Sequence, residues 1–213
     1  MPEKIRVLIA DDHAIVRQGF KQIFSETDDL EVAGEADDGV EALQLARQKE
    51  WDVFLLDVTM PNRNGIDTLK QLKKEFPRQP VLILSMHPEE QYAVRAIKAG
   101  ASGYLTKQSA PEQLVTAIRQ VARGKKYVSP AVAEQLANAI SNDSEKPLHE
   151  LLTDREFQVF KLIAAGKPLT QIAEELNLAV ATISTFRTRI IEKTGLKSNA
   201  EIIRYGLEHG LVE

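Results

Sequence analysis

The sequence VFLLDVTMP, residues 53–61, decides the fold of the N-terminal part of this chain. Its first four residues are all apolar, which is typical of a parallel strand that helices cover on both faces. Asp57 follows this run directly, although an unpaired buried carboxylate costs several kcal/mol. A carboxylate at the end of a buried strand therefore indicates either an ionic partner or a functional role. Asp57 is the first candidate site residue.

Similar apolar runs recur on both sides of this strand. They are IRVLIA at 5–10, LEVAGE at 30–35, PVLILS at 80–85 and SGYLT at 102–106. Helical patterns alternate with them at 13–25, 38–49, 65–75, 88–99 and 110–123. Five strands alternating with five helices predict an α/β fold with a doubly wound, open parallel sheet. Right-handed crossovers then bring the strand ends and their loops to a common edge.

A second pattern begins near residue 148. LLTDRE, residues 151–156, places Thr153 before an apolar stripe and Glu156 three residues later, which predicts a capping box. Further short helices are expected in TQIAEEL, VATISTFRTRIIEKTG and NAEIIRYGLEHG. Helix stops are expected at Gly166, Asn177, Gly195 and Gly210. Only about three residues separate the second and third helices, the spacing of a helix-turn-helix.

The stretch NAISNDSEKPLHE, residues 138–150, is polar, contains a proline and shows no periodicity. It reads as part of a linker between the two patterns. The expected organisation is an α/β domain at 1–124, a linker at 125–147 and an all-α four-helix domain at 148–213.

Composition excludes several classes of protein. The 213 residues are 43% hydrophobic and 27% charged, which is ordinary for a soluble globular protein. The absence of cysteine excludes disulfides, thiolate metal sites and thiol catalysis. No stretch approaches the ~18 apolar residues of a membrane span, and no signal peptide is visible, so a cytoplasmic protein without a membrane partner is expected. The histidines at 13, 87, 149 and 209 are scattered, so they do not predict a metal site of their own.

Polar residues follow four of the five predicted strands. Asp11 and Asp12 end the first, Asp57 the third, Ser85 the fourth and Lys107 the fifth. In an open α/β sheet these ends form the ligand site. Carboxylates that converge repel one another or recruit a cation, and oxygen ligands favour a hard ion such as Mg²⁺. With a hydroxyl and an ammonium beside them, they suit phosphoryl transfer to a carboxylate nucleophile.

The segments IADDH, LLDVTMPNRNG, LSMH and AGASGYLTK resemble the receiver domains of two-component response regulators, over residues 4–124. The resemblance implies a flavodoxin-like sheet of order 2-1-3-4-5. It also implies that a sensor histidine kinase phosphorylates Asp57, and that Asp11, Asp12, Asp57 and the backbone carbonyl of Thr59 hold Mg²⁺.

The same resemblance assigns roles at the last two strands. Ser85 matches a switch hydroxyl, Tyr104 an aromatic switch and Lys107 a phosphate-binding lysine. Pro61 and Gly65 match the loop that shapes the site. Many receivers have a proline after the lysine, where this chain has Gln108. The conformational coupling that the family transmits through the loop after this lysine is therefore not carried over to this chain.

Two other functions stay open at this point. A phosphatase of the haloacid-dehalogenase type also uses a strand-end aspartate, but it needs an acid two residues later, where Thr59 stands. A P-loop enzyme is excluded because the chain has no G-x-x-x-x-G-K-[ST] motif. A DNA-binding regulator whose N-terminal domain acts without phosphorylation is the second alternative.

Residues 148–213 resemble the LuxR-type helix-turn-helix, and the whole chain resembles the NarL/FixJ class of response regulators. The matching segments are LTDRE, AAGKPLTQIAEELNL, TISTFRTRIIEKTGL and IIRYGLEHGLV. Within the class, ISTFRTRIIEK is most similar to the branch that includes BvgA and GacA. The resemblance implies sequence-specific binding to double-stranded DNA and control of transcription.

Periodicity divides the third helix of this half into two faces. The stripe expected to pack inward holds Ile183, Phe186, Ile190 and Thr194. The opposite face carries short polar side chains with basic neighbours, as in recognition helices. Contacts to bases are assigned to Ser184, Thr185 and Thr188. Contacts to phosphates are assigned to Arg187, Arg189, Lys193 and Lys197, together with Thr170 and Gln171 of the preceding helix.

Charge also bears on the partners. The formal net charge is −4, but the chain from Lys146 onward has nine Lys or Arg and nine Asp or Glu, so the C-terminal part is neutral. A protein with few basic contacts gains affinity for DNA by dimerising on paired half-sites. We therefore expect a homodimer in the active state, with RNA polymerase as a further partner that such a regulator can have.

Overall fold

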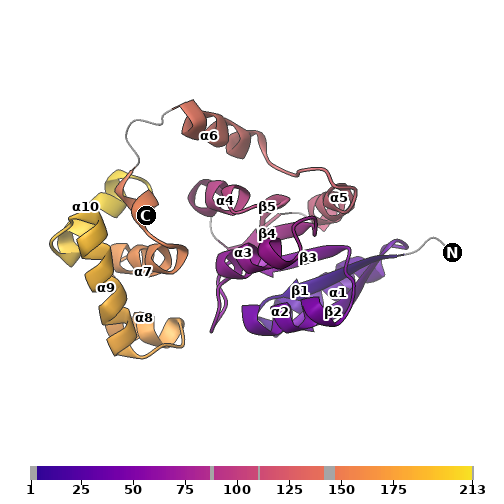
Figure 1. Ribbon diagram of the computed structural model, residues 1–213, viewed down its shortest axis with the longest axis horizontal. Coiled ribbons are helices and arrows are strands. Elements are labelled where there is room, and N and C mark those ends of the chain that lie inside the picture. Colours follow the sequence, from indigo (N-terminus) through magenta and orange to yellow (C-terminus); the bar gives the residue numbers. More distant parts are fainter. Residues whose placement is uncertain (1–3, 87–88, 110, 142–146, 213) are drawn as a thin grey trace. The chain divides into compact units, whose positions relative to one another are not determined.

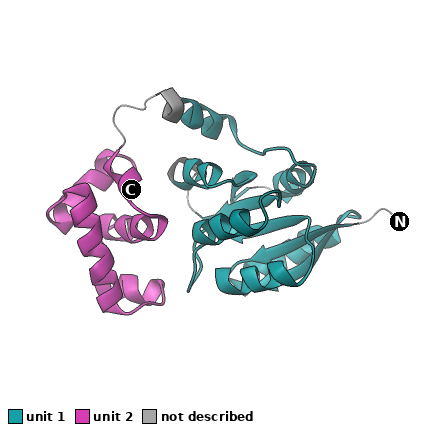
Figure 2. Ribbon diagram, viewed as in Figure 1, with its two compact units in different colours: residues 1–138 teal, residues 139–213 magenta. Residues whose placement is uncertain are grey.

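The computed structural model describes residues 4–86, 89–109, 111–141 and 147–212. The chain forms two compact units, residues 1–138 and residues 139–213 (Figure 2). No helix in the described part of the chain has the length and apolar character needed to cross a membrane. Each unit has its own buried core, so the two are described separately.

The first unit is built around a five-stranded parallel sheet of order β2-β1-β3-β4-β5 (Figure 1), which confirms the predicted fold. The strands are β1 Ile5–Ala10, β2 Leu30–Ala36, β3 Val53–Asp57, β4 Val81–Ser85 and β5 Gly103–Thr106. The helices between and after them are α1 Ala14–Ser25, α2 Gly39–Gln48, α3 Gly65–Glu75, α4 Glu89–Lys98 and α5 Pro111–Ala122.

Helices cover both faces of this sheet (Figure 1). Phe20 and Phe24 of α1 and Ile118 of α5 pack with alternate strand residues such as Val53 and Leu55. The helices α2, α3 and α4 cover the other face. All five residues of β3 are buried, which explains why its sequence has no polar alternation.

The segment 125–147, expected to link the domains, is partly structured. Tyr127 forms a bridge with Gly103 of β5, and its N–H donates to the carbonyl of Ser102 at 2.8 Å. A further helix, α6, spans Pro130–Ser141 and buries Val132. The boundary between the units falls after residue 138. The sequence pattern missed α6 because its alanines give only a weak contrast between two faces.

The second unit is all-α, as predicted. A short 3-10 helix at Leu148–Leu151 precedes α7 Asp154–Ala164, α8 Leu169–Glu175, α9 Val180–Thr194 and α10 Asn199–Glu208. The capping box of Thr153 and Glu156 is present at the start of α7. The predicted stops at Gly166, Asn177, Gly195 and Gly210 all have positive φ. Residues 176–179 form the turn between α8 and α9.

Candidate functional site

The central strands place two carboxylates at one edge of the sheet. Leu56 of β3 pairs with Ala10 of β1, so Asp57 and Asp11 leave the sheet side by side. Both carboxylates are buried, with 3% of Asp57 and 1% of Asp11 exposed. Gly65 lies so close to β3 that a Cβ there would stand 1.9 Å from the Asp57 carbonyl oxygen. The loop after β3 therefore folds back tightly onto the strand end.

Lys107 joins the two buried carboxylates. Its Nζ lies 2.6 Å from Asp11 Oδ2 and 2.9 Å from Asp57 Oδ2, and only 5% of its side chain is exposed. The N–H of Lys107 donates to the carbonyl of Ser85 at 2.7 Å, which fixes the start of this side chain beside β4. The predicted convergence of Asp11, Asp57 and Lys107 is thus present in the structure.

Burial dominates the electrostatics of this site. It raises the pKa of Asp57 to about 6, against the opposing effect of the Lys107 ammonium and with a further rise from Asp11. Burial also acts to lower the pKa of Lys107, but the two carboxylates outweigh it and raise that pKa. Asp57 is therefore a carboxylate poised near neutral pH beside a firmly charged ammonium.

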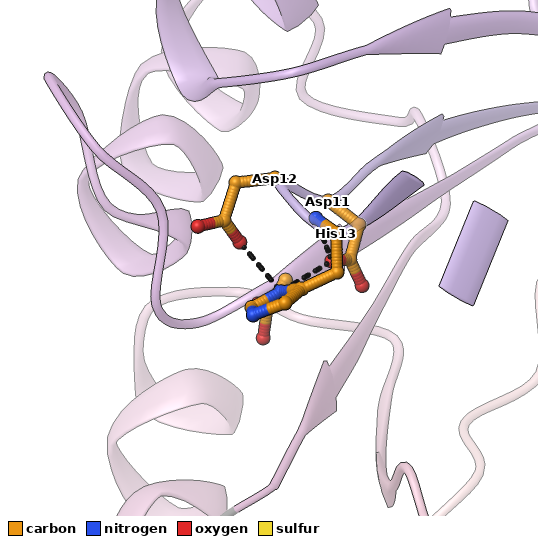
Figure 3. Close-up of side chains that lie close together, drawn as sticks. Asp11, Asp12 and His13 are labelled. Carbon is orange, nitrogen blue, oxygen red and sulfur yellow. Dashed lines mark hydrogen bonds and ion pairs between the residues drawn. The ribbon is translucent and has the colours of Figure 1, made fainter. Parts of the chain in front are cut away.

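Asp12 and His13 complete a cluster on the solvent side (Figure 3). His13 Nδ1 lies 2.9 Å from Asp12 Oδ1 and 3.2 Å from Asp11 Oδ1. Ligand atoms of Asp11, Asp12, His13 and Asp57 all lie within 4.8 Å of one another. Three carboxylates at this spacing are the donors that a hard divalent cation prefers, so the cluster fits Mg²⁺.

Two supports of the site escaped the sequence analysis. Arg17 of α1 donates to the backbone carbonyl of Asp11 and pairs with Asp37 at 2.7 Å. Asn62, with φ of 56°, donates from its amide to Asp38, the N-cap of α2. These contacts hold the loops after β1 and β3. A local sequence pattern does not predict them, because the bonded partners are 6 to 24 residues apart.

The other predicted receiver residues differ in exposure. Ser85 is fully buried at the end of β4, and Tyr104 of β5 is 1% exposed. Thr59 is half-buried, and its backbone N–H donates to the Asp57 carboxylate. Gln108 is exposed. Residue 87, one of the four histidines, lies outside the described residues.

His149 and His209 are not scattered in space. Their ring centroids lie 6.2 Å apart, and both pack on Tyr205 of α10. His149 Nδ1 lies 3.1 Å from the Tyr205 hydroxyl, and His209 Nδ1 lies 2.9 Å from the Tyr205 carbonyl. These contacts join the residues before α7 to the last helix, which gives the pair a structural role.

In the second unit, α9 presents a polar face to solvent. Ser184, Thr185 and Thr188 are exposed, as expected for the assigned base contacts. The hydroxyls of Thr185 and Thr188 donate to carbonyls one turn earlier, at 3.0 and 3.1 Å. Because these hydroxyl protons are engaged, the two oxygens are left to act as acceptors. Thr170 and Gln171 are exposed in the first turn of α8.

The inward stripe of α9 is largely as predicted. Ile183, Ile190 and Thr194 are buried, whereas Phe186 is only half-buried. Phe186 therefore contributes less to the core than its place in the helical pattern indicates.

The four basic residues assigned to phosphates differ in their surroundings. Arg187 Nε donates to Asn199 Oδ1 at 2.6 Å, and Lys193 Nζ pairs with Glu156 Oε2 at 2.6 Å. Arg189 and the Lys197 ammonium are exposed, and neither has a hydrogen bond or ion pair within the described part of the chain. Two of the four cations thus have structural partners inside the unit.

Comparisons with known proteins match both units. Residues 7–119 match the response regulator receiver domain, and residues 150–206 match the bacterial regulatory proteins of the luxR family. The chain is 36% identical to the oxygen regulatory protein NreC of Staphylococcus carnosus, over 98% of this chain and 100% of that relative. It is also 36% identical to response regulator GacA of Pseudomonas aeruginosa, with 98% of each chain covered.

Solved structures of response regulators are also similar to this chain. A LuxR-family two-component response regulator from Aurantimonas sp. SI85-9A1 has 34% identity and a TM-score of 0.60, over 66% of this chain and 100% of that one. RcsB from Salmonella enterica serovar Typhimurium, bound to promoter P1flhDC, has 27% identity and a TM-score of 0.60, over 95% of this chain and 98% of that one.

Proposed function

Because this chain belongs to the two-component response regulators that join a receiver to a LuxR-type DNA-binding domain and regulate transcription, we propose that phosphorylation of Asp57 controls its binding to DNA. The observation that carries the proposal is the position of Lys107 Nζ between Asp57 and Asp11 at the edge of the sheet. A sensor histidine kinase is the expected phosphoryl donor, and the domains expected from the sequence, 1–124 and 148–213, divide the two roles.

The transfer step uses Asp57 as the nucleophile. One carboxylate oxygen forms a bond to phosphorus while the bond between phosphorus and the kinase imidazole nitrogen breaks, and the imidazole leaves with that electron pair. Lys107 neutralises charge on the phosphoryl oxygens. In the metal-free protein the raised pKa of Asp57 keeps part of the carboxyl protonated near pH 6, and only the ionised carboxylate is a nucleophile. Hydrolysis of the acyl phosphate would return the protein to its resting state.

Mg²⁺ is the proposed cofactor, held by Asp11, Asp12, Asp57 and the backbone carbonyl of Thr59. When bound, it would supply positive charge for the transferring phosphoryl group. The support for this cofactor is the chemistry of the donor set, in which carboxylate oxygens predominate within 4.8 Å.

The signal then passes to the second unit. In this proposal Ser85 moves toward the phosphoryl group, Tyr104 adjusts to it, and the receiver promotes a homodimer that binds double-stranded DNA. Structures of RcsB dimers on DNA support this arrangement by analogy. Ser184, Thr185 and Thr188 are proposed to read bases, while Arg189, Lys197, Thr170 and Gln171 contact phosphates. The protein would act in the cytoplasm, with RNA polymerase as a further candidate partner.

Labelling and footprinting test the proposal together. Wild type, Asp57→Asn and the matched control Asp52→Asn are incubated with acetyl phosphate and Mg²⁺, and the phosphorylated fraction is measured by mass spectrometry. Wild type and Asp52→Asn should be labelled and should gain dimer and DNA affinity, while Asp57→Asn should do neither. Full labelling of Asp57→Asn would overturn the choice of Asp57. Labelling of wild type without any change in dimer or DNA affinity would favour a receiver that acts independently of phosphorylation.

A further inference from the structure

His13 brings a ring nitrogen into a cluster that otherwise contains only carboxylates. Figure 3 shows its imidazole reaching both Asp11 and Asp12, with Nδ1 at 3.2 and 2.9 Å from their Oδ1 atoms. The backbone N–H of His13 also donates to Asp11 Oδ1 at 2.9 Å. The loop after β1 thus holds His13 beside the carboxylates by three contacts, two from the ring and one from the backbone.

These separations match those between neighbouring ligands of one metal ion. Two ligands at right angles, each about 2.1 Å from an octahedral ion, lie about 3.0 Å apart. The distances from His13 Nδ1 to the two Oδ1 atoms, 2.9 and 3.2 Å, fall on both sides of that value. A cation bonded to the Asp11 and Asp12 oxygens therefore needs little movement of Nδ1 to accept it as a ligand, and takes the place of the Nδ1 proton, which is released to solvent.

Exposure favours the same role. Asp11 and Asp57 are buried against Lys107, whereas the side chains of Asp12 and His13 are 33% and 59% exposed. The cluster accordingly has a closed side toward the ammonium and an open side formed by Asp12 and His13. A cation that enters from solvent meets the imidazole before it reaches Asp57.

We propose that His13 is a ligand of the divalent cation at this site, and that its nitrogen gives the site a preference for borderline ions such as Co²⁺ and Ni²⁺ over Mg²⁺. Imidazole suits these transition ions, whereas Mg²⁺ prefers carboxylate and water oxygens. The inference rests on the proposed metal site of the receiver and adds a residue and a selectivity to it. With this ligand, the metal that supports phosphorylation depends on which ions are available.

Calorimetric titration of the full-length protein with Mg²⁺, Co²⁺ and Ni²⁺ separately tests this proposal. His13→Asn is the informative variant, because its amide can still donate to Asp12 but cannot ligate as imidazole does. We expect His13→Asn to weaken Co²⁺ and Ni²⁺ binding on the order of 10-fold or more, and Mg²⁺ binding by much less. The visible spectrum of bound Co²⁺ should also lose its nitrogen-ligand character. His209→Asn, in the second unit, should change none of these values.

The remaining outcomes separate two failures. Equal losses for all three ions, or no loss for any, would overturn the role of His13 as a ligand while leaving the Mg²⁺ site in place. Failure of the wild type to bind any of the ions would overturn the metal site itself, and this inference with it. Labelling of wild-type Asp57 by acetyl phosphate with Mg²⁺ is measured separately, so the proposed function is tested without the His13 variant.

Discussion

At the scale of single residues, the cost of burying Asp57 has a measurable consequence. Burial raises the pKa of Asp57 from 3.8 to about 6. A carboxyl whose pKa is higher in the folded state stabilises the fold while it is protonated, and this contribution disappears as pH rises through 6. Above that pH, the metal-free protein carries an ionised group that costs up to about 3 kcal/mol.

Asp57→Asn should therefore stabilise the metal-free first unit at pH 7.5. The neutral amide avoids the cost of the buried charge, so we expect the free energy of unfolding to rise by about 1–3 kcal/mol in the presence of a chelator. The gain should shrink below pH 4. Urea unfolding followed by the fluorescence of Trp51, the single tryptophan, measures it. Asp52→Asn, at the other end of the strand and paired with Arg6, is the control and should not stabilise.

Gly65 gives a second test at this scale. An added Cβ would stand 1.9 Å from the Asp57 carbonyl oxygen, so the loop after β3 must shift. We expect Gly65→Ala to destabilise the first unit by about 3 kcal/mol or more and to lower the rate of phosphorylation. Gly19→Ala, with nothing within 4 Å of its added Cβ, should instead stabilise α1 by roughly 0.5–1 kcal/mol. Equal changes in the free energy of unfolding for the two variants would contradict the close approach of Gly65 to the Asp57 carbonyl.

At the scale of elements, the position of α9 depends on a contact with α7. Lys193 pairs with Glu156, which is 2% exposed and also closes the capping box of α7. Burial acts to raise the pKa of Glu156, but its bonds to Lys193 and Thr153 outweigh this and lower it. The stability from this contact is consequently present above the usual glutamate pKa and is lost as pH falls through the lower folded value.

The salt dependence of DNA binding distinguishes basic residues of α9 that contact phosphates from those that stabilise the unit. Arg189→Gln removes an exposed charge, so the slope of log affinity against log salt should decrease in magnitude by about 1. Lys193→Gln should leave that slope nearly unchanged and lower the melting temperature of the second unit, since its charge already faces Glu156. A reduced slope for Lys193→Gln at unchanged stability would instead support the phosphate contact that the sequence predicts for Lys193.

At the scale of the whole molecule, the two compact units should unfold in separate steps. Calorimetry of the full chain should show two transitions. Asp57→Asn should shift only the one that Trp51 fluorescence follows, and Glu156→Gln only the other. A single transition, displaced by both variants, would show that the units unfold together.

Much of this architecture was predictable because its signals are local. Continuous apolar runs such as VFLL predicted the buried strands, and the four helix stops near the C-terminus all have the expected positive φ. The residues at the strand ends predicted the candidate site, because the carboxyl ends of parallel strands lie at one edge of the sheet. The helix α6 and the bridge of Tyr127 to Gly103 were missed, because their pattern is weak and the partner of Tyr127 is distant in the chain.

The sequence by itself determined which chemical groups stand at the strand ends and which face of α9 is polar, because residue type and periodicity decide both. Only the tertiary structure decided how those groups meet. It placed Lys107 between Asp11 and Asp57, raised the pKa of Asp57 by burial, and turned Lys193 toward Glu156. It also brought His13 Nδ1 to both carboxylates. Distances and burial depend on packing between segments far apart in the chain, which no local pattern contains.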